Sequence, residues 1–175
     1  MEVSKIEVAE RLLETAIKLY FDEEDPCSIH LLGLSAYDIL RDLCKKKGLA
    51  IMSLKDLTYI NSNYKQEIRE LFNKYQNFFK HADRDPNASV EFKPETTDVF
   101  LFQAVECIGK MKPKISPYIE LYRIWFIFNN QNMFSLSKEE EYTYNEIAKD
   151  SMNSRHEFKD VMLEVIRQYF GDTRR

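Results

Sequence analysis

The sequence is poor in the two residue types that most often mark turns. Its 175 residues include 4 glycines and 5 prolines, well under the roughly 12% that these two types average together. Sandwiches and barrels need a turn about every 8–12 residues, usually built on glycine or proline. The sequence therefore argues against an all-β fold and against glycine-rich phosphate-binding loops, and it favours long helices joined by few connections.

Cysteine and long apolar runs are also scarce. Cys27, Cys44 and Cys107 are the 3 cysteines and form no C-x-x-C pair, which argues against a disulfide framework and a thiolate zinc site. The longest apolar-rich run, 118–128, is far shorter than the roughly 20 residues that a membrane-spanning helix needs. The first residues lack the pattern of a secretion signal. We expect a soluble, cytoplasmic protein with reduced thiols and no membrane partner.

The charge balance lacks a basic surplus. Lys and Arg number 25 against 29 Asp and Glu, for a net charge of −4. Proteins that bind nucleic acid generally carry a basic surplus, because their affinity comes from neutralising phosphates. The charge therefore does not support a general nucleic-acid binder, but it leaves room for a local basic strip or for a nuclease with a small site.

Hydrophobic periodicity and helix-capping residues predict an all-α protein. Ser4 is a candidate N-cap for a helix that runs to about Phe21, with apolar residues three and four positions apart. Asp25-Pro26 opens a second helix, which ends in a cationic turn and Gly48. The same signals predict further helices over 62–82, from 94–97 to 111, over 117–129, from 137, and over 154–171. The segment 50–60 is ambiguous and leaves open one short helix that starts at Ser53. Residues 88–92 are predicted to be extended.

These elements predict a single helical domain over 1–175, a bundle of about six to seven helices with an up-down core of four long ones. The core would span 4–111, and 115–171 would be a C-terminal helical addition. The helix 117–129 is apolar on nearly every side. Its aromatic residues are Tyr118, Tyr122, Trp125, Phe126 and Phe128. They fit a core, the interface of a homodimer or a stacking platform for bases, and we expect self-association because one small bundle would leave part of this helix uncovered.

Residues able to do chemistry gather at the end of the helix 62–82. His81 lies on a flank of that helix, away from its apolar stripe, with Lys74 and Asn77 on the same flank. An imidazole, an amide and an ammonium group in a row could bind an anion or move a proton near neutral pH. The alternative is a solvated helix edge whose last-turn histidine is favoured by the helix dipole.

The loop that follows has two interpretations. Asp83, Asp85 and His81 are close enough in sequence to share a divalent ion. However, aspartates also cap helices and close turns, Pro86 enforces a helix end, and Arg84 between the aspartates can form exposed ion pairs. The structural interpretation is favoured, so we predict no metal or other cofactor.

The other two histidines are predicted to be structural. His30, in the first turn of the second helix, is expected to be partly buried and hydrogen-bonded, and His156 is expected to be exposed. The sequence contains no Glu-x-x-His, His-Glu-x-x-His, Gly-x-Ser-x-Gly or Gly-Lys-Ser/Thr pattern. This argues against a di-iron carboxylate bundle and against the common hydrolase and nucleotide-binding motifs.

The string 76–81, Gln-Asn-Phe-Phe-Lys-His, near the end of a long helix resembles the motif of the HEPN superfamily (higher eukaryotes and prokaryotes nucleotide-binding). That motif is Arg, four to six residues, then His, often with a polar residue directly after the Arg. Asn77 and His81 match, whereas Gln76 stands where the Arg is expected. The resemblance covers about 6–111 in layout. It implies a small helical bundle that commonly dimerises and, in many members, cuts RNA without metal in defence or toxin–antitoxin systems.

The resemblance also implies roles for the residues. His81 would help to move a proton, with Asn77 and Lys80 beside the scissile phosphate. Lys74, Lys80 or Arg84 would supply the charge that Gln76 lacks, although an ammonium group lacks the bidentate grip of a guanidinium.

Three functions follow from this sequence. The first is a HEPN-like protein that binds RNA or a nucleotide, either as an RNase or as a relative without cleavage. The alternative is a non-catalytic, dimeric helical module that binds a protein partner. The third is a metal-dependent bundle that uses His81, Asp83 and Asp85 with His30. Whether the chain is an enzyme stays open at this level.

Overall fold

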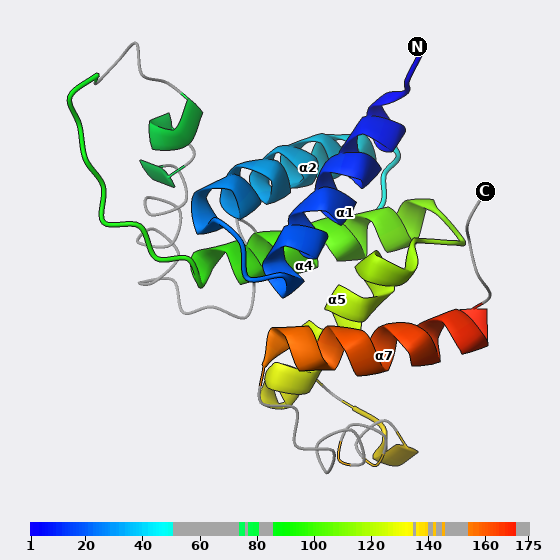
Figure 1. Ribbon diagram of the computed structural model, residues 1–175. Coiled ribbons are helices and arrows are strands. Elements are labelled where there is room, and N and C mark those ends of the chain that lie inside the picture. The colour runs from blue at the N-terminus through cyan, green and yellow to red at the C-terminus, as the bar shows by residue number, and fades with distance from the viewer. Residues whose placement is uncertain are drawn as a thin grey trace.

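The computed structural model describes residues 1–50, 74–75, 77–80, 86–134, 136–139, 142, 145 and 154–170. Over these residues the chain is all-α, with no strand (Figure 1). The helices are α1 (Lys5–Phe21), α2 (Pro26–Lys46), α4 (Thr96–Met111), α5 (Pro117–Asn129), the short 3-10 helix η2 (Gln131–Met133) and α7 (Arg155–Phe170). The predicted class, a single packed helical bundle, is confirmed.

The first two helices begin and end where the local signals predicted. Ser4 Oγ accepts a hydrogen bond from the Glu7 N–H at 3.3 Å, and the Glu7 carboxylate accepts one from the Ser4 N–H at 2.8 Å, which makes a capping box. Asp25 caps α2 by accepting from the Ser28 N–H at 2.8 Å. Gly48 follows α2 with a φ of 66°, the left-handed conformation in which glycine is favoured.

The later helices agree with their predictions where the structure describes them. Ser116 caps α5, with Pro117 as its first residue, and Ser154 Oγ accepts from the Glu157 N–H at 3.1 Å before α7. Residues 74–75 and 77–80 (the 74–80 turn) are helical, as are 138–139, whereas the ambiguous segment from 53 lies outside the described residues. Residues 88–92 carry no helix; Val90 and Phe92 are half-buried between exposed neighbours, as expected for an extended segment.

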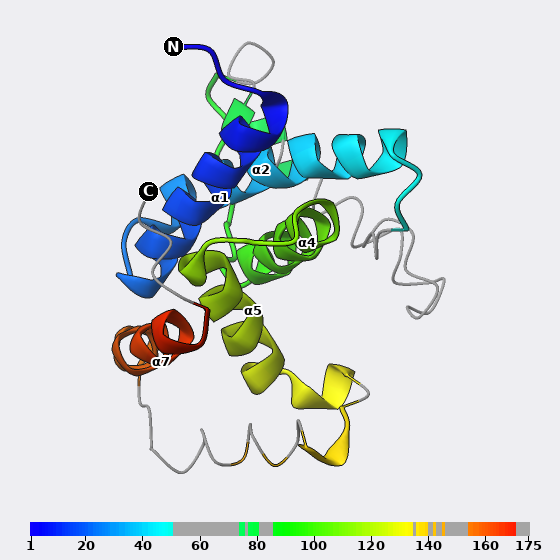
Figure 2. The same cartoon turned by 90° about the vertical axis from the view of Figure 1, so that its right-hand side faces the viewer.

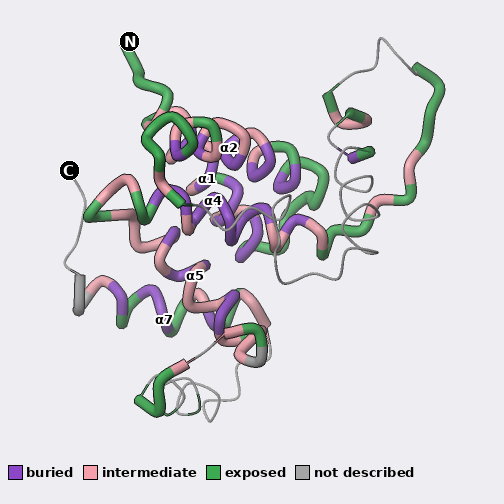
Figure 3. Tube along the Cα trace, turned by 180° about the vertical axis from the view of Figure 1, so that it is seen from behind, coloured by how far each residue is buried: buried purple, intermediate pink, exposed green. Residues whose placement is uncertain are grey.

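The helices pack in two groups that share one core. α1 and α2 lie side by side, and α4 crosses beneath them (Figures 1 and 2). α5 leaves the end of α4 at an angle and is covered by α7, which also reaches α1. Buried residues of α1, α2, α4, α5 and α7 form one cluster, and the buried faces turn toward one another (Figure 3).

The aromatic residues of α5 belong to this core. Tyr122 is fully buried and donates a hydrogen bond to the Asp98 carbonyl at 3.0 Å. Trp125 Nε1 donates to the Tyr20 hydroxyl at 3.2 Å, and its ring lies 4.9 Å from that of Phe158 on α7. These rings therefore pack within the chain, and α7 covers part of α5. Self-association stays a prediction without support from them.

None of the described helices combines the length and the apolar character that a membrane crossing requires.

Candidate functional site

The structure describes only part of the site predicted at the end of the helix 62–82. Lys74 and Asn77 are exposed on the 74–80 turn, as expected for a polar flank. Lys80 Nζ lies 3.2 Å from a carboxylate oxygen of Asp38 on α2. The other predicted site residues lie outside the described part of the chain, and their roles stay predictions: His81, Asp83, Arg84 and Asp85.

Lys80 belongs to a charged cluster that the sequence did not reveal. Asp38 also accepts a hydrogen bond from Arg41 Nη1 at 2.9 Å, so one carboxylate holds two cations. Arg41 further pairs with Asp42 at 3.1 Å, and its guanidinium lies over the ring of Tyr37 at 5.5 Å. The Asp38–Arg41 pair is visible as a three-residue spacing on α2. Its meeting with Lys80, 42 residues from Asp38, is a tertiary contact.

His30 lies in an aromatic cage under the 74–80 turn. It is fully buried, not partly buried as expected, and the expected hydrogen bond is present between Nδ1 and Thr97 Oγ1 at 2.9 Å. Four rings surround it with centroids 5.0 to 6.0 Å away: Tyr75, Phe79, Phe92 and Phe100. Nε2 has no hydrogen-bond partner within the described residues. Burial, with a smaller contribution from the charge of Lys80, lowers the pKa of His30 to about 4, so the ring is neutral at physiological pH.

A metal site involving His30 finds no support in this surrounding. The residues around its ring are aromatic, and the described part of the chain holds no group of three or more His, Cys, Asp or Glu side chains placed to bind a metal. His156 is exposed, as expected, with its side chain 58% accessible and 3.3 Å from Asp160.

One cavity of about 350 Å³, called here the Asp98 pocket, lies where the end of α1 meets the starts of α2, α4 and α7. Its polar lining residues are Tyr20, Glu23, Glu24, Glu95, Thr97, Asp98 and Arg155. Arg155 stacks on the ring of Tyr20 at 4.3 Å and lies 3.7 Å from the carboxylate of Glu23. Thr97, the partner of His30, forms part of its wall, so the caged imidazole lies directly behind this pocket.

Asp98 is the titrating group of this pocket. Burial raises its pKa to about 6, although the hydrogen bond from Tyr20 and the charge of Arg155 act in the opposite direction. Burial and the nearby Asp98 charge raise the pKa of Tyr20 to about 12. A carboxyl group that titrates near neutral pH within a cleft has the properties of a general acid or base. The sequence analysis did not name Asp98, because nothing in its neighbourhood along the chain signals burial beside Tyr20.

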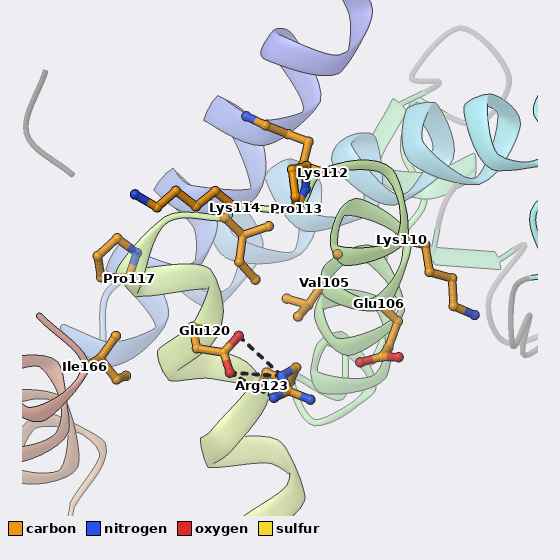
Figure 4. A pocket seen from close by; sticks show the side chains of 12 residues that line it. Val105, Glu106, Lys110, Lys112, Pro113, Lys114, Pro117, Glu120, Arg123 and Ile166 are labelled. Carbon is orange, nitrogen blue, oxygen red and sulfur yellow. Dashed lines mark hydrogen bonds and ion pairs between the residues drawn. The ribbon is translucent and has the colours of Figure 1, made fainter. Parts of the chain in front are cut away.

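A second cavity of about 340 Å³, called here the Lys114 pocket, lies at the corner between α4 and α5 (Figure 4). Its apolar wall consists of Val105, Ile115 and Ile166 with Pro113 and Pro117, and Gly109 opens one side. Its charged lining residues are Glu106, Lys110, Lys112, Lys114, Glu120 and Arg123. Four of these residues are cationic and two are acidic, and Arg123 pairs with Glu120 within the lining.

Comparison with known proteins gives no assignment, since no protein-family model matches the chain and neither a curated protein nor a solved structure is significantly similar to it. What is established is a small all-α protein. The HEPN resemblance rests on the string 76–81 and on the helical layout.

Proposed function

We propose that this chain is a HEPN-like protein that binds RNA where α2 meets the 74–80 turn. The observation that carries the proposal is the sharing of Asp38 by Arg41 and Lys80. The HEPN motif needs a guanidinium near its His, and Gln76 does not provide one. Arg41, from a neighbouring helix, supplies a guanidinium beside Lys80, the residue that precedes His81 in sequence. By the same resemblance, the protein would act in a defence or toxin–antitoxin system.

The chemistry of this cluster suits a phosphodiester. A guanidinium can hold two phosphate oxygens at once, and an ammonium group adds a second positive charge. The Asp38 carboxylate keeps both cations in place while RNA is absent, and a bound phosphate would take over part of that pairing. Asn77 and Lys74 are exposed on the same turn and extend the polar surface for the RNA backbone.

The catalytic form of the proposal uses no metal. The ribose 2′-hydroxyl attacks the adjacent phosphorus, so that the O2′–P bond forms while the P–O5′ bond breaks. His81 would take the proton from the 2′-hydroxyl or give one to the leaving 5′-oxygen. Arg41 and Lys80 would stabilise the charge that builds on the phosphate oxygens in the transition state. The non-catalytic form keeps the RNA contact and lacks this step.

RNA binding is tested with a short fluorescent single-stranded RNA, by anisotropy across a salt series. Arg41→Gln and Lys80→Ala should each weaken binding and reduce the salt slope by about 1, as expected for the loss of one phosphate contact. Arg41→Lys should restore part of the affinity. Lys138→Ala removes an exposed lysine outside the cluster and serves as the matched control. Wild-type protein that fails to bind RNA at low salt would overturn the proposal.

Cleavage is tested separately, by incubating total RNA with the wild type and with His81→Ala in the presence of a chelator. Cleavage that His81→Ala abolishes supports the RNase. RNA binding without cleavage in either protein supports the non-catalytic relative and ends the RNase form.

A second candidate function is a protein-interaction module, with a homodimer as its simplest form. The observation that favours it is on α7, where Val161 and Val165 are 46% and 37% exposed and lie one turn apart. Such a pair suits the apolar face of a partner helix. Light scattering on the wild type and on Val161→Lys tests the homodimer; a wild-type monomer at micromolar concentration ends that form of the proposal.

A further inference from the structure

The Lys114 pocket contains a glycine that the packing of the described residues does not require. A Cβ atom added at Gly109 would meet no atom within 4 Å. At Gly33, in contrast, a Cβ would come within 2.7 Å of Leu101 Cδ2, so close helix packing explains that glycine. Glycine is a poor helix former, yet Gly109 lies within α4, two residues before its end. Its effect is to leave open space at the pocket wall.

The open space is bounded by an apolar surface. Val105, Ile115 and Ile166 come from α4, from the connection before α5, and from α7. The volume of about 340 Å³ is within the range of small-molecule sites in proteins. A ligand that fills it would remove apolar surface on three segments from water and would leave one end at the charged rim.

The charges around the rim are divided between two sides (Figure 4). Glu106, Glu120 and Arg123 lie on one side, where Arg123 and Glu120 pair at 2.9 Å. Lys112 and Lys114 lie on the side of the α4–α5 connection, and the side chains of Lys110, Lys112 and Lys114 all extend outward from the rim of the cavity.

The two lysines on that side differ in their partners. Lys112 Nζ lies 2.6 Å from a carboxylate oxygen of Glu10 on α1. Lys114 is exposed and has no ion pair or hydrogen bond from its side chain within the described residues. The positive charge available to a ligand is therefore on the side of Lys114.

We propose that the Lys114 pocket binds a small amphipathic anion, a carboxylate or phosphate monoester with an apolar body. The anionic group pairs with Lys114, and the apolar body lies against Val105 and Ile115 in the space beside Gly109. This is a second site, built from other residues than the Arg41–Lys80 cluster.

The probes are octanoate and octyl phosphate, which share the apolar chain and differ in the anionic group. Octylammonium, with the same chain and the opposite charge, is the control ligand. Binding is followed through the methyl NMR signals of Val105, Ile115 and Ile166 and through the shift in melting temperature. Saturable shifts with either anion and none with octylammonium are expected, and the stronger of the two anions identifies the preferred head group.

Two variants locate the ligand. Gly109→Leu directs a side chain into the open space from a Cβ that meets no atom within 4 Å, and it should abolish binding. Gly109→Ala should give a partial loss and guards against misfolding of the larger variant. Lys114→Ala should weaken binding about fivefold, the loss of one exposed ion pair, while Lys138→Ala should leave it unchanged. The proposal is overturned if neither anion saturates the methyl shifts, if folded Gly109→Leu binds as the wild type does, or if octylammonium binds as well as octanoate.

Discussion

His30 on α2 and Thr97 on α4 are joined by a buried hydrogen bond of 2.9 Å that spans 67 residues of sequence. The next residue on α4, Asp98, interacts with Tyr20 in the pocket that Thr97 also lines. The first turn of α4 thus connects a caged imidazole with a titrating carboxyl group. Their pKa values are shifted in opposite directions by the same cause, burial, which disfavours the charged form of each.

His30 should make the protein less stable in mild acid. Its pKa is about 4 in the folded chain and about 6.5 when unfolded, so the unfolded chain binds the extra proton first as the pH falls. The contribution of the neutral His30 ring to the free energy of unfolding is complete above about pH 6.5. It is lost as the pH falls from there to about 4, which lowers the free energy of unfolding by roughly 3 kcal/mol.

The measurement is the free energy of unfolding in urea, at about pH 7 and about pH 4.5, for the wild type and His30→Gln. Asp98, Lys80 and Asp38 are common to both proteins, so the difference between their pH dependences isolates the imidazole. The variant should be less stable at neutral pH and should lose less stability on acidification. Equal pH dependences would contradict the burial of a neutral His30.

Asp98 should change the stability of the protein with pH in the opposite direction to His30. Its folded pKa of about 6 lies above the ordinary 3.8, so its favourable contribution is present below about pH 3.8 and is lost as the pH rises through about 6. Asp98→Asn should therefore stabilise the protein at pH 7 by about 1 kcal/mol, since the ionised form no longer has to be buried while part of the Tyr20 and Arg155 interaction is lost.

Thermal unfolding at neutral and acidic pH checks this prediction. Asp160→Asn, which changes an exposed carboxylate, is the control and should have little effect. A destabilised Asp98→Asn at pH 7 would show that the contacts with Tyr20 and Arg155 outweigh the cost of burial.

Two glycine substitutions should have effects of opposite sign. Gly109→Ala should stabilise α4 by about 0.5–1 kcal/mol, because alanine is the better helix former and open space surrounds the new methyl group. Gly33→Ala should destabilise the protein by about 1–3 kcal/mol, because its Cβ would overlap Leu101. Urea unfolding of both variants measures the pair, and a stabilised Gly33→Ala would mean that α2 and α4 can separate at little cost.

Trp125 should be a large contributor to stability, since its ring packs on Phe21 and Phe158 and its indole N–H donates to Tyr20. Trp125→Ala should lower the free energy of unfolding by about 3 kcal/mol through loss of this packing. Trp125→Phe keeps an aromatic ring but removes the indole N–H donor, and it should lower the free energy of unfolding by less. An unchanged melting temperature for Trp125→Ala would place the ring on the surface and restore it as a candidate interface residue.

Local features of the chain were predictable because their causes lie within a few residues. Ser4 with Glu7, Asp25 with Pro26, and Ser116 with Pro117 each satisfy the free N–H groups at a helix start through neighbours in sequence. Periodicity likewise identified the apolar faces. The polar flank of Lys74 and Asn77 was correct for the same reason.

The spacing of apolar residues could not predict the cage around His30, and it indicated only partial burial of that side chain. The rings that enclose it come from three segments, including the 74–80 turn and Phe92, and no spacing along the chain relates them. Arg41 was missed for a similar reason. Its pairing with Asp38 is local, but the contact of Lys80 with the same carboxylate depends on how the 74–80 turn lies against α2.

The amino-acid sequence by itself determined that the chain forms helices, where most of them start and stop, and which stripe of each turns inward, because hydrogen bonds, caps and the 3.6-residue period act over a single turn or two. Only the tertiary structure decided that α7 covers α5, that Asp98 lies half-buried beside Tyr20, and that cavities form at the α1–α4 and α4–α5 corners. Those features depend on the angles at which helices cross, and these angles are set by the packing of side chains distant in sequence.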